Sequence, residues 1–133
     1  MIKGIAHVCF VTPQLDALAA FYTEKLGLEP AFDFVENGER RGVYLHAGGR
    51  SFIELFAGKV GPSPDEPAFR HFCLEVDDIE KALADLREKG LQLIDEMPHT
   101  GPEGEKFAFI HPKSTHGVLI ELYEYPQSAT AHK

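Results

Sequence analysis

Two histidine–glutamate pairs recur at similar spacing in the sequence. His7 and Glu54 are 47 positions apart, and His71 and Glu121 are 50 positions apart. Each glutamate lies within an apolar run, FIELF for the first and LIELY for the second. A carboxylate in such a run costs free energy unless it is paired or binds a metal. Imidazoles and carboxylates are ligands of Ni²⁺, Co²⁺, Zn²⁺ and Mn²⁺, so the sequence predicts one divalent metal held by these four residues.

The alternation of side chains along a strand supports the same interpretation. In FIELF, Glu54 shares one face with Phe52 and Phe56, while Ile53 and Leu55 point to the other face. The run LIELY repeats this arrangement around its own glutamate. We therefore expect an aliphatic face covered by a helix and an opposite face that carries the glutamate.

The strands and helices that must position these residues occur in the same order in each half of the sequence. The first half predicts strands over 2–12, 28–36, 41–47 and 50–57, and a helix that begins at Thr12-Pro13 and ends at Gly27. The second half predicts strands over 69–76, 91–97, 106–111 and 117–125, and a helix that begins at Asp77 with Glu80 as its capping partner and ends at Gly90.

The repeat predicts an α+β fold made of two βαβββ modules. The modules cover residues 1–57 and 69–125, the Pro- and Gly-rich segment 58–68 links them, and 126–133 forms a C-terminal tail. One helix covers only one face of a four-stranded sheet, so the two modules should pair. We expect a curved, concave eight-stranded sheet with the helices outside and the four ligands brought together. Because a single module would leave a sheet edge exposed, we also expect a homodimer.

Composition limits the partners and the compartment. The net charge of −8 argues against binding to nucleic acid or to an anionic membrane surface. No stretch approaches the length of a membrane span, and the N-terminus lacks the features of a signal peptide. Two cysteines do not form a disulfide framework. A cytoplasmic protein is the expectation.

Several segments resemble the vicinal-oxygen-chelate superfamily, which includes glyoxalase I, methylmalonyl-CoA epimerase, bleomycin-resistance proteins and extradiol dioxygenases. The resemblance rests on IAHVCFV, FYTEKLGLE, FIELF, RHFCLEVDDIEKAL and VLIELYE. It implies paired βαβββ modules with a metal on the concave face, open to two substrate oxygens. The family's ligand positions correspond to His7, Glu54, His71 and Glu121.

The resemblance implies a lyase or isomerase that transfers a proton at the carbon next to a metal-held carbonyl or thioester oxygen. Glu121 and Glu54 are the candidate bases, with Glu121 preferred. The expected substrate is a small hemithioacetal or acyl thioester. One alternative is a binding protein similar to bleomycin-resistance proteins, and another is an iron-dependent dioxygenase of the extradiol type.

Two subfamilies compete within this interpretation. Bacterial glyoxalase I uses an Arg and an Asn to hold glutathione, at positions that here are Val11 and Gly58, which argues against glutathione. The stretch LIDEMPHTGPEGEKFAFIHPKSTHGVLIEL resembles methylmalonyl-CoA epimerases. Within it, Lys113, Ser114 and His116 are candidates for contact with a substrate phosphate or carboxylate.

Overall fold

A computed structural model describes residues 1–59 and 68–126 of the chain. Within those residues the order βαβββ occurs twice. The first repeat consists of β1 (Ile2–Thr12), α1 (Leu15–Ala20), the π-helical turn η1 (Phe21–Lys25), β2 (Glu29–Glu36), β3 (Glu39–His46) and β4 (Phe52–Ala57). The second consists of β5 (Ala68–Val76), α2 (Ile79–Glu88), β6 (His99–Thr100), β7 (Lys106–Ile110), the 3-10 turn η2 (Pro112–Ser114) and β8 (Ile120–Glu124). Most of the predicted linker 58–68 and tail 126–133 lies outside the described residues.

The chain divides into two compact units, and β1 contributes to both. The N-terminal unit comprises His7–Arg70, and the C-terminal unit comprises Met1–Ala6 with the described residues from His71 onward. The strand order is β2-β3-β4-β1 in the first and β1-β5-β8-β7-β6 in the second. The pairs β1–β4 and β5–β8 are parallel, and the neighbouring pairs β3–β4 and β7–β8 are antiparallel. The predicted α+β class with an eight-stranded sheet is confirmed. No helix in the described part of the chain is long and apolar enough to span a bilayer.

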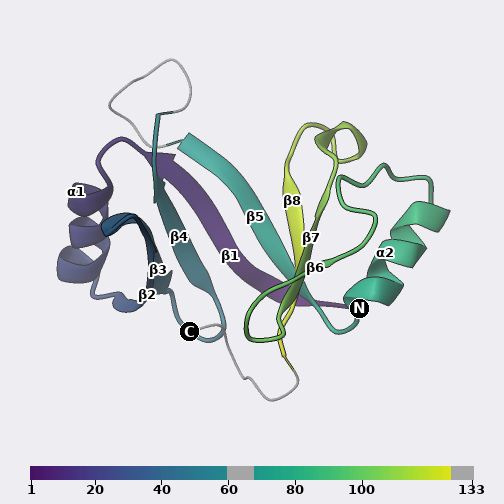
Figure 1. Cartoon of the computed structure of the whole chain (residues 1–133), viewed down its shortest axis with the longest axis horizontal. Coiled ribbons are helices and arrows are strands. Elements are labelled where there is room, and N and C mark those ends of the chain that lie inside the picture. Colours follow the sequence, from purple (N-terminus) through teal and green to yellow (C-terminus); the bar gives the residue numbers. More distant parts are fainter. Residues whose placement is uncertain (60–67, 127–133) are drawn as a thin grey trace. The chain divides into compact units, whose positions relative to one another are not determined.

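The core of the N-terminal unit lies between α1 and strands β3 and β4 (Figure 1). Leu15 and Ala19 of α1 pack against Val43 and Leu45 of β3 and against Leu55 of β4. The three strand residues are almost wholly buried. As predicted, the aliphatic face of FIELF is the one that α1 covers.

The first helix begins later than predicted. The sequence predicts Thr12 as its N-cap and Pro13 as its first residue, but the helix begins at Leu15. Thr12 remains in β1, where its backbone carbonyl accepts a hydrogen bond from the N–H of Gly58 at 2.8 Å. Its hydroxyl accepts from the N–H of Gln14 at 3.0 Å. The β-ladder thus holds Thr12 in the strand, and its side chain stabilises the turn that precedes the helix.

The core of the C-terminal unit lies between α2 and strands β7 and β8. Ile79 and Leu83 of α2 join Ala108 and Ile110 of β7 and Leu122 of β8. The aliphatic face of LIELY therefore packs into this core, which matches the arrangement in the other unit. In both units the glutamate of the IEL motif points to the opposite side of its strand.

The cap of α2 also differs from the prediction by one residue. Asp78, not Asp77, accepts a hydrogen bond from the backbone N–H of Lys81, at 3.1 Å. The N–H of Asp77 donates to the carbonyl of Met1 at 3.2 Å. That bond holds Asp77 at the end of the sheet, so the next residue becomes the cap.

The predicted strand 91–97 is wrong. The segment makes only one isolated bridge among the described residues, between Leu93 and Ile110. The Oδ2 of Asp95 accepts from the backbone N–H of Phe109 at 2.8 Å. A side chain thus takes the place of a backbone acceptor, which interrupts the ladder. Regular pairing with β7 resumes only in the short β6, in a stretch predicted as loop.

Candidate metal centre

The N-terminal unit brings together the first predicted pair. His7 lies on β1 and Glu54 on β4, and the Nε2 of His7 is 3.5 Å from the Oε1 of Glu54. The parallel register pairs His7 with Phe52 and Cys9 with Glu54. The two side chains are 3% and 11% exposed, respectively. The ladder thus fixes both donor groups on one face in a buried setting.

A tyrosine completes the surroundings of His7. The hydroxyl of Tyr44 lies 2.6 Å from the Nδ1 of His7, and both residues are buried. Tyr44 lies on β3, where it is the cross-strand partner of Glu54. The two rings meet edge to face, with centroids 5.4 Å apart. One nitrogen of His7 therefore contacts the phenol and the other is close to the carboxylate.

The C-terminal unit brings together the second predicted pair. His71 lies on β5 and Glu121 on β8, and the Nε2 of His71 is 3.1 Å from the Oε1 of Glu121. The parallel register pairs Cys73 with Glu121, so each histidine lies two residues before the cysteine that faces its glutamate. Phe109 of β7 is opposite Glu121 and meets the ring of His71 edge to face at 5.3 Å.

The spacing within each pair suits neighbouring ligands of one ion. Metal–nitrogen and metal–oxygen bonds to zinc are each about 2.1 Å, so two ligand atoms at a right angle are about 3 Å apart. The observed separations of 3.1 and 3.5 Å are close to that value. Each pair therefore supplies buried groups that could bind a divalent metal.

The three candidate substrate-binding residues lie in the loop that contains η2. The hydroxyl of Ser114 accepts from the backbone N–H of Gln92 at 2.8 Å. The N–H of Lys113 donates to the Nδ1 of His111 at 3.0 Å, which fixes its backbone while its side chain is exposed. His116 is exposed and has a φ of 60°. Ser114 thus has a structural role, and substrate contact by the three remains a prediction.

Sequence reasoning missed Tyr44. A signal for it exists in the repeat, because Tyr44-Leu45-His46 on β3 corresponds to Phe109-Ile110-His111 at the end of β7. Each triplet precedes an IEL motif in the sequence. The antiparallel register places the aromatic residue of each triplet opposite the glutamate of that motif. Comparison of the two halves at this triplet would have placed Tyr44 beside the first pair.

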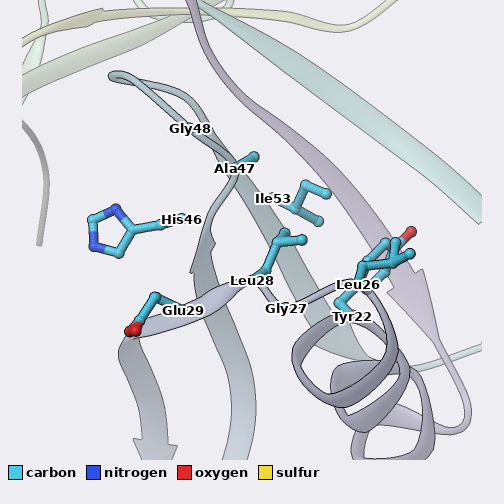
Figure 2. A pocket seen from close by; sticks show the side chains of 9 residues that line it. All are labelled: Tyr22, Leu26, Gly27, Leu28, Glu29, His46, Ala47, Gly48 and Ile53. Atoms are coloured by element: carbon cyan, nitrogen blue, oxygen red, sulfur yellow. The ribbon is translucent and has the colours of Figure 1, made fainter.

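A pocket of about 450 Å³ opens elsewhere in the N-terminal unit (Figure 2). Ile53, Leu28 and Tyr22 give it an apolar wall, and Glu29 and His46 add polar groups. Ile53 is adjacent to Glu54 in the strand, so their side chains point to opposite faces. The pocket is therefore on the helix-covered side of β4 and is not the site of the His7–Glu54 pair.

Comparison with known proteins places the chain in a family. Residues 4–122 match the model of the Glyoxalase/Bleomycin resistance protein/Dioxygenase superfamily. The match covers nearly all of both βαβββ repeats and includes all four candidate ligands. The chain belongs to this superfamily, as its sequence motifs predict.

Within that superfamily the chain is similar to methylmalonyl-CoA epimerases. It is 35% identical to the mitochondrial methylmalonyl-CoA epimerase of Dictyostelium discoideum, over 92% of this chain and 79% of the relative. It is 34% identical to the human mitochondrial methylmalonyl-CoA epimerase, over 87% of this chain and 70% of the relative. These relatives are isomerases.

Solved structures agree with the sequence relatives. The methylmalonyl-CoA epimerase of Mycobacterium tuberculosis is similar with a TM-score of 0.77 and 27% identity, over 98% of this chain and 93% of that one. A variant of the Streptomyces coelicolor methylmalonyl-CoA epimerase in complex with 2-nitronate-propionyl-CoA has a TM-score of 0.76 and 26% identity, over 97% and 100% of the two chains.

Proposed function

We propose that the chain is a metal-dependent epimerase of acyl-CoA thioesters, similar to methylmalonyl-CoA epimerase. The observation that carries the proposal is the recurrence of a buried histidine–glutamate pair, in the same parallel-strand register, in each unit. The epimerases among the relatives support the choice of substrate class.

The proposed ligands are His7, Glu54, His71 and Glu121, acting together on one ion. Two neutral imidazoles and two carboxylates balance the charge of a divalent ion, and Ni²⁺, Co²⁺, Zn²⁺ and Mn²⁺ all accept such ligands. When bound, the ion would act as a Lewis acid on the carbonyl oxygen of the substrate and make the C–H of the α-carbon, next to that carbonyl group, more acidic. The protein supplies the donor groups and their buried setting.

The two glutamates are the proposed proton-transfer groups. Epimerisation removes a proton from one face of the α-carbon and returns one to the other face. Glu121 and Glu54 come from corresponding strands of the two repeats. The chain therefore has two carboxyl groups, one to remove the proton from one face of the α-carbon and one to return a proton to the other face. Glu121 is the preferred base in this proposal. General acid–base groups of this kind contribute about 10²–10⁴-fold to rate.

The residues around Val11 favour a thioester substrate over a glutathione hemithioacetal. A Cβ added to Gly58 would lie 2.9 Å from the Cγ1 of Val11, so the two positions are adjacent within the N-terminal unit. Neither side chain carries a hydrogen-bonding group. The two positions that hold glutathione in glyoxalase I therefore offer it no polar side chain here.

Lys113, Ser114 and His116 stay in the proposal as candidates for substrate contact. The side chain of Lys113 is exposed, and the ammonium group of a lysine suits a phosphate of coenzyme A. His116 is exposed in the same loop. Neither group is required for the metal site, so their loss should raise KM more than it lowers kcat.

The test is turnover by the metal-loaded protein. Methylmalonyl-CoA in deuterated water should undergo epimerisation and incorporate deuterium at its α-carbon, and a chelator should abolish both. A hemithioacetal of glutathione and methylglyoxal should be a poor substrate. Turnover of the hemithioacetal alone would assign a glyoxalase. Tight binding of a small molecule without turnover would assign a binding protein, and oxygen uptake with a catechol would assign a dioxygenase.

A further inference from the structure

We propose that Tyr44 is a positioning residue that holds His7 in the tautomer and orientation needed to present its Nε2 to the metal. The inference rests on the proposed function, because it concerns one of the proposed ligands. Its starting point is the distance of 2.6 Å between the hydroxyl of Tyr44 and the Nδ1 of His7.

The phenol ring of Tyr44 is itself held firmly. It stacks on Phe52 with centroids 4.8 Å apart and an interplanar angle of 21°, and it meets Phe34 edge to face at 6.0 Å. Phe52 is in turn the cross-strand partner of His7. Tyr44 is 2% exposed and Phe52 is 1% exposed. Packing on several sides leaves the hydroxyl little freedom, so it defines a fixed point for the imidazole.

The roles at this contact depend on the tautomer of His7: the hydroxyl of Tyr44 accepts from Nδ1–H in one and donates to Nδ1 in the other, and a metal on Nε2 requires the first. With Nδ1–H donating to the hydroxyl oxygen of Tyr44, the neutral ring keeps its lone pair on Nε2. That is the nitrogen that lies 3.5 Å from the Oε1 of Glu54. A histidine ligand commonly donates its other N–H in this way, and the bond also raises the basicity of the ligand nitrogen.

The other unit supplies an internal comparison. Phe109 occupies the place opposite Glu121 that Tyr44 occupies opposite Glu54. The ring distances to the two histidines are nearly the same, 5.4 Å for Tyr44 and 5.3 Å for Phe109. The aromatic packing is thus common to both repeats, and the hydroxyl is the added group. Tyr44→Phe would give the first pair the arrangement that the second pair already has, so we expect it to fold.

The experiment measures metal affinity of the purified chain by competition with a chelator, using Zn²⁺ or Ni²⁺. Tyr44→Phe should weaken the affinity by about 10- to 100-fold, the usual effect of losing an outer partner of a ligand. Tyr22→Phe is the matched control, because it removes the hydroxyl of a half-buried tyrosine in the same unit. It should leave the affinity unchanged. Nitrogen-15 NMR should show His7 protonated at Nδ1 in the natural chain and a mixture of tautomers in Tyr44→Phe.

His7→Ala separates failure of this inference from failure of the proposed function. If His7→Ala loses the metal while Tyr44→Phe keeps full affinity and an unchanged tautomer, Tyr44 has no positioning role and the inference is wrong. If His7→Ala binds the metal as tightly as the natural chain, His7 is not a ligand, and the proposed function fails with the positioning role. If metal-free Tyr44→Phe unfolds at the same temperature as the metal-free natural chain, the effect of the substitution is local to His7. A large fall in the unfolding temperature of Tyr44→Phe, with the tautomer of His7 unchanged, would overturn the positioning role.

Discussion

The Nε2 of His71 lies 3.1 Å from the Oε1 of Glu121, across the parallel strands β5 and β8. Their position depends on register, because a shift of β8 by one residue would turn Glu121 toward α2 and Leu122 toward His71. The aliphatic neighbours of the glutamate are buried against α2, and this packing opposes such a shift. The hydrophobic core of the unit thus maintains the geometry of the pair.

The first prediction concerns the metal. His71→Ala should lose most of the divalent metal that we expect the natural chain to retain after purification without chelator, because it would remove one proposed nitrogen ligand from a buried site. Elemental analysis of the two proteins checks this. His99→Ala is the control, since His99 is exposed and bonded to Asp95 at 2.9 Å. An unchanged metal content in His71→Ala would remove His71 from the ligand set.

Local patterns predicted most of the fold because the apolar alternation, the glycines and the turns agree with one another. The turn at Asn37-Gly38, for example, adopts φ of 54° and 79°, which is the conformation that an Asn-Gly hairpin turn prefers. The errors occur where a distant residue decides the outcome. Thr12 stays in β1 because its carbonyl accepts a hydrogen bond from the N–H of Gly58, and Asp77 stays at the sheet because its own N–H donates to the carbonyl of Met1. Neither partner is visible from local sequence.

The two histidine–glutamate pairs of the candidate site could be predicted from the sequence, but the tyrosine beside the first pair was not predicted. Matching positions in the two repeats identified His7 with Glu54 and His71 with Glu121, and the structure brings each pair together within its own unit. Tyr44 was missed because an aromatic residue in an apolar strand carries no chemical signal by itself. Its hydroxyl becomes informative only through the ring nitrogen that it contacts.

The second prediction concerns the cap of α2. Asp78→Ala should lower the free energy of unfolding by about 1 kcal/mol, because it removes the acceptor for the N–H of Lys81. Asp77→Ala should have a smaller effect, since its exposed carboxylate makes only a long ion pair with the N-terminal amine, at 4.0 Å. Urea denaturation of both variants checks the order. A larger loss for Asp77→Ala would favour the capping pattern predicted from the sequence.

The third prediction concerns alkaline stability. Burial, reinforced by the negative charge of Glu105, raises the pKa of Tyr123 well above its usual value. The unfolded chain therefore releases this proton first, at about pH 10. Above that pH the folded state binds more protons than the unfolded state, so stability falls by up to about 1.4 kcal/mol per pH unit from this group. Below it the group has no effect.

Tyr123→Phe should remove this contribution to the slope. The free energy of unfolding, measured by urea denaturation between about pH 9 and about pH 11, should fall less steeply for the variant than for the natural chain. An equal slope in both proteins would mean that Tyr123 ionises in the folded state as readily as in the unfolded one.

The fourth prediction concerns oligomeric state. The sequence predicts a homodimer, and two large apolar side chains at the start of the chain, Ile2 and Ile5, are each 55% exposed. Light scattering after gel filtration at micromolar concentration should give twice the chain mass of 14.8 kDa. A strictly monomeric chain would contradict this prediction and leave the metal ligands unaffected.

The last prediction concerns the proposed base. Glu121→Gln should preserve the fold, because the side chain is nearly isosteric and an amide can still bond to the imidazole of His71. Activity should fall by about 10²–10⁴-fold, since an amide is a very poor base at neutral pH, while much of the metal is retained. Deuterium exchange into the α-carbon of methylmalonyl-CoA should fall with it. Glu88→Gln, an exposed change on α2, is the matched control and should keep full activity. If Glu121→Gln keeps full turnover and exchange while Glu54→Gln loses both, the base is Glu54. If neither variant changes the exchange, proton transfer by these carboxylates is wrong, and binding of a small molecule without turnover becomes the better description of the site.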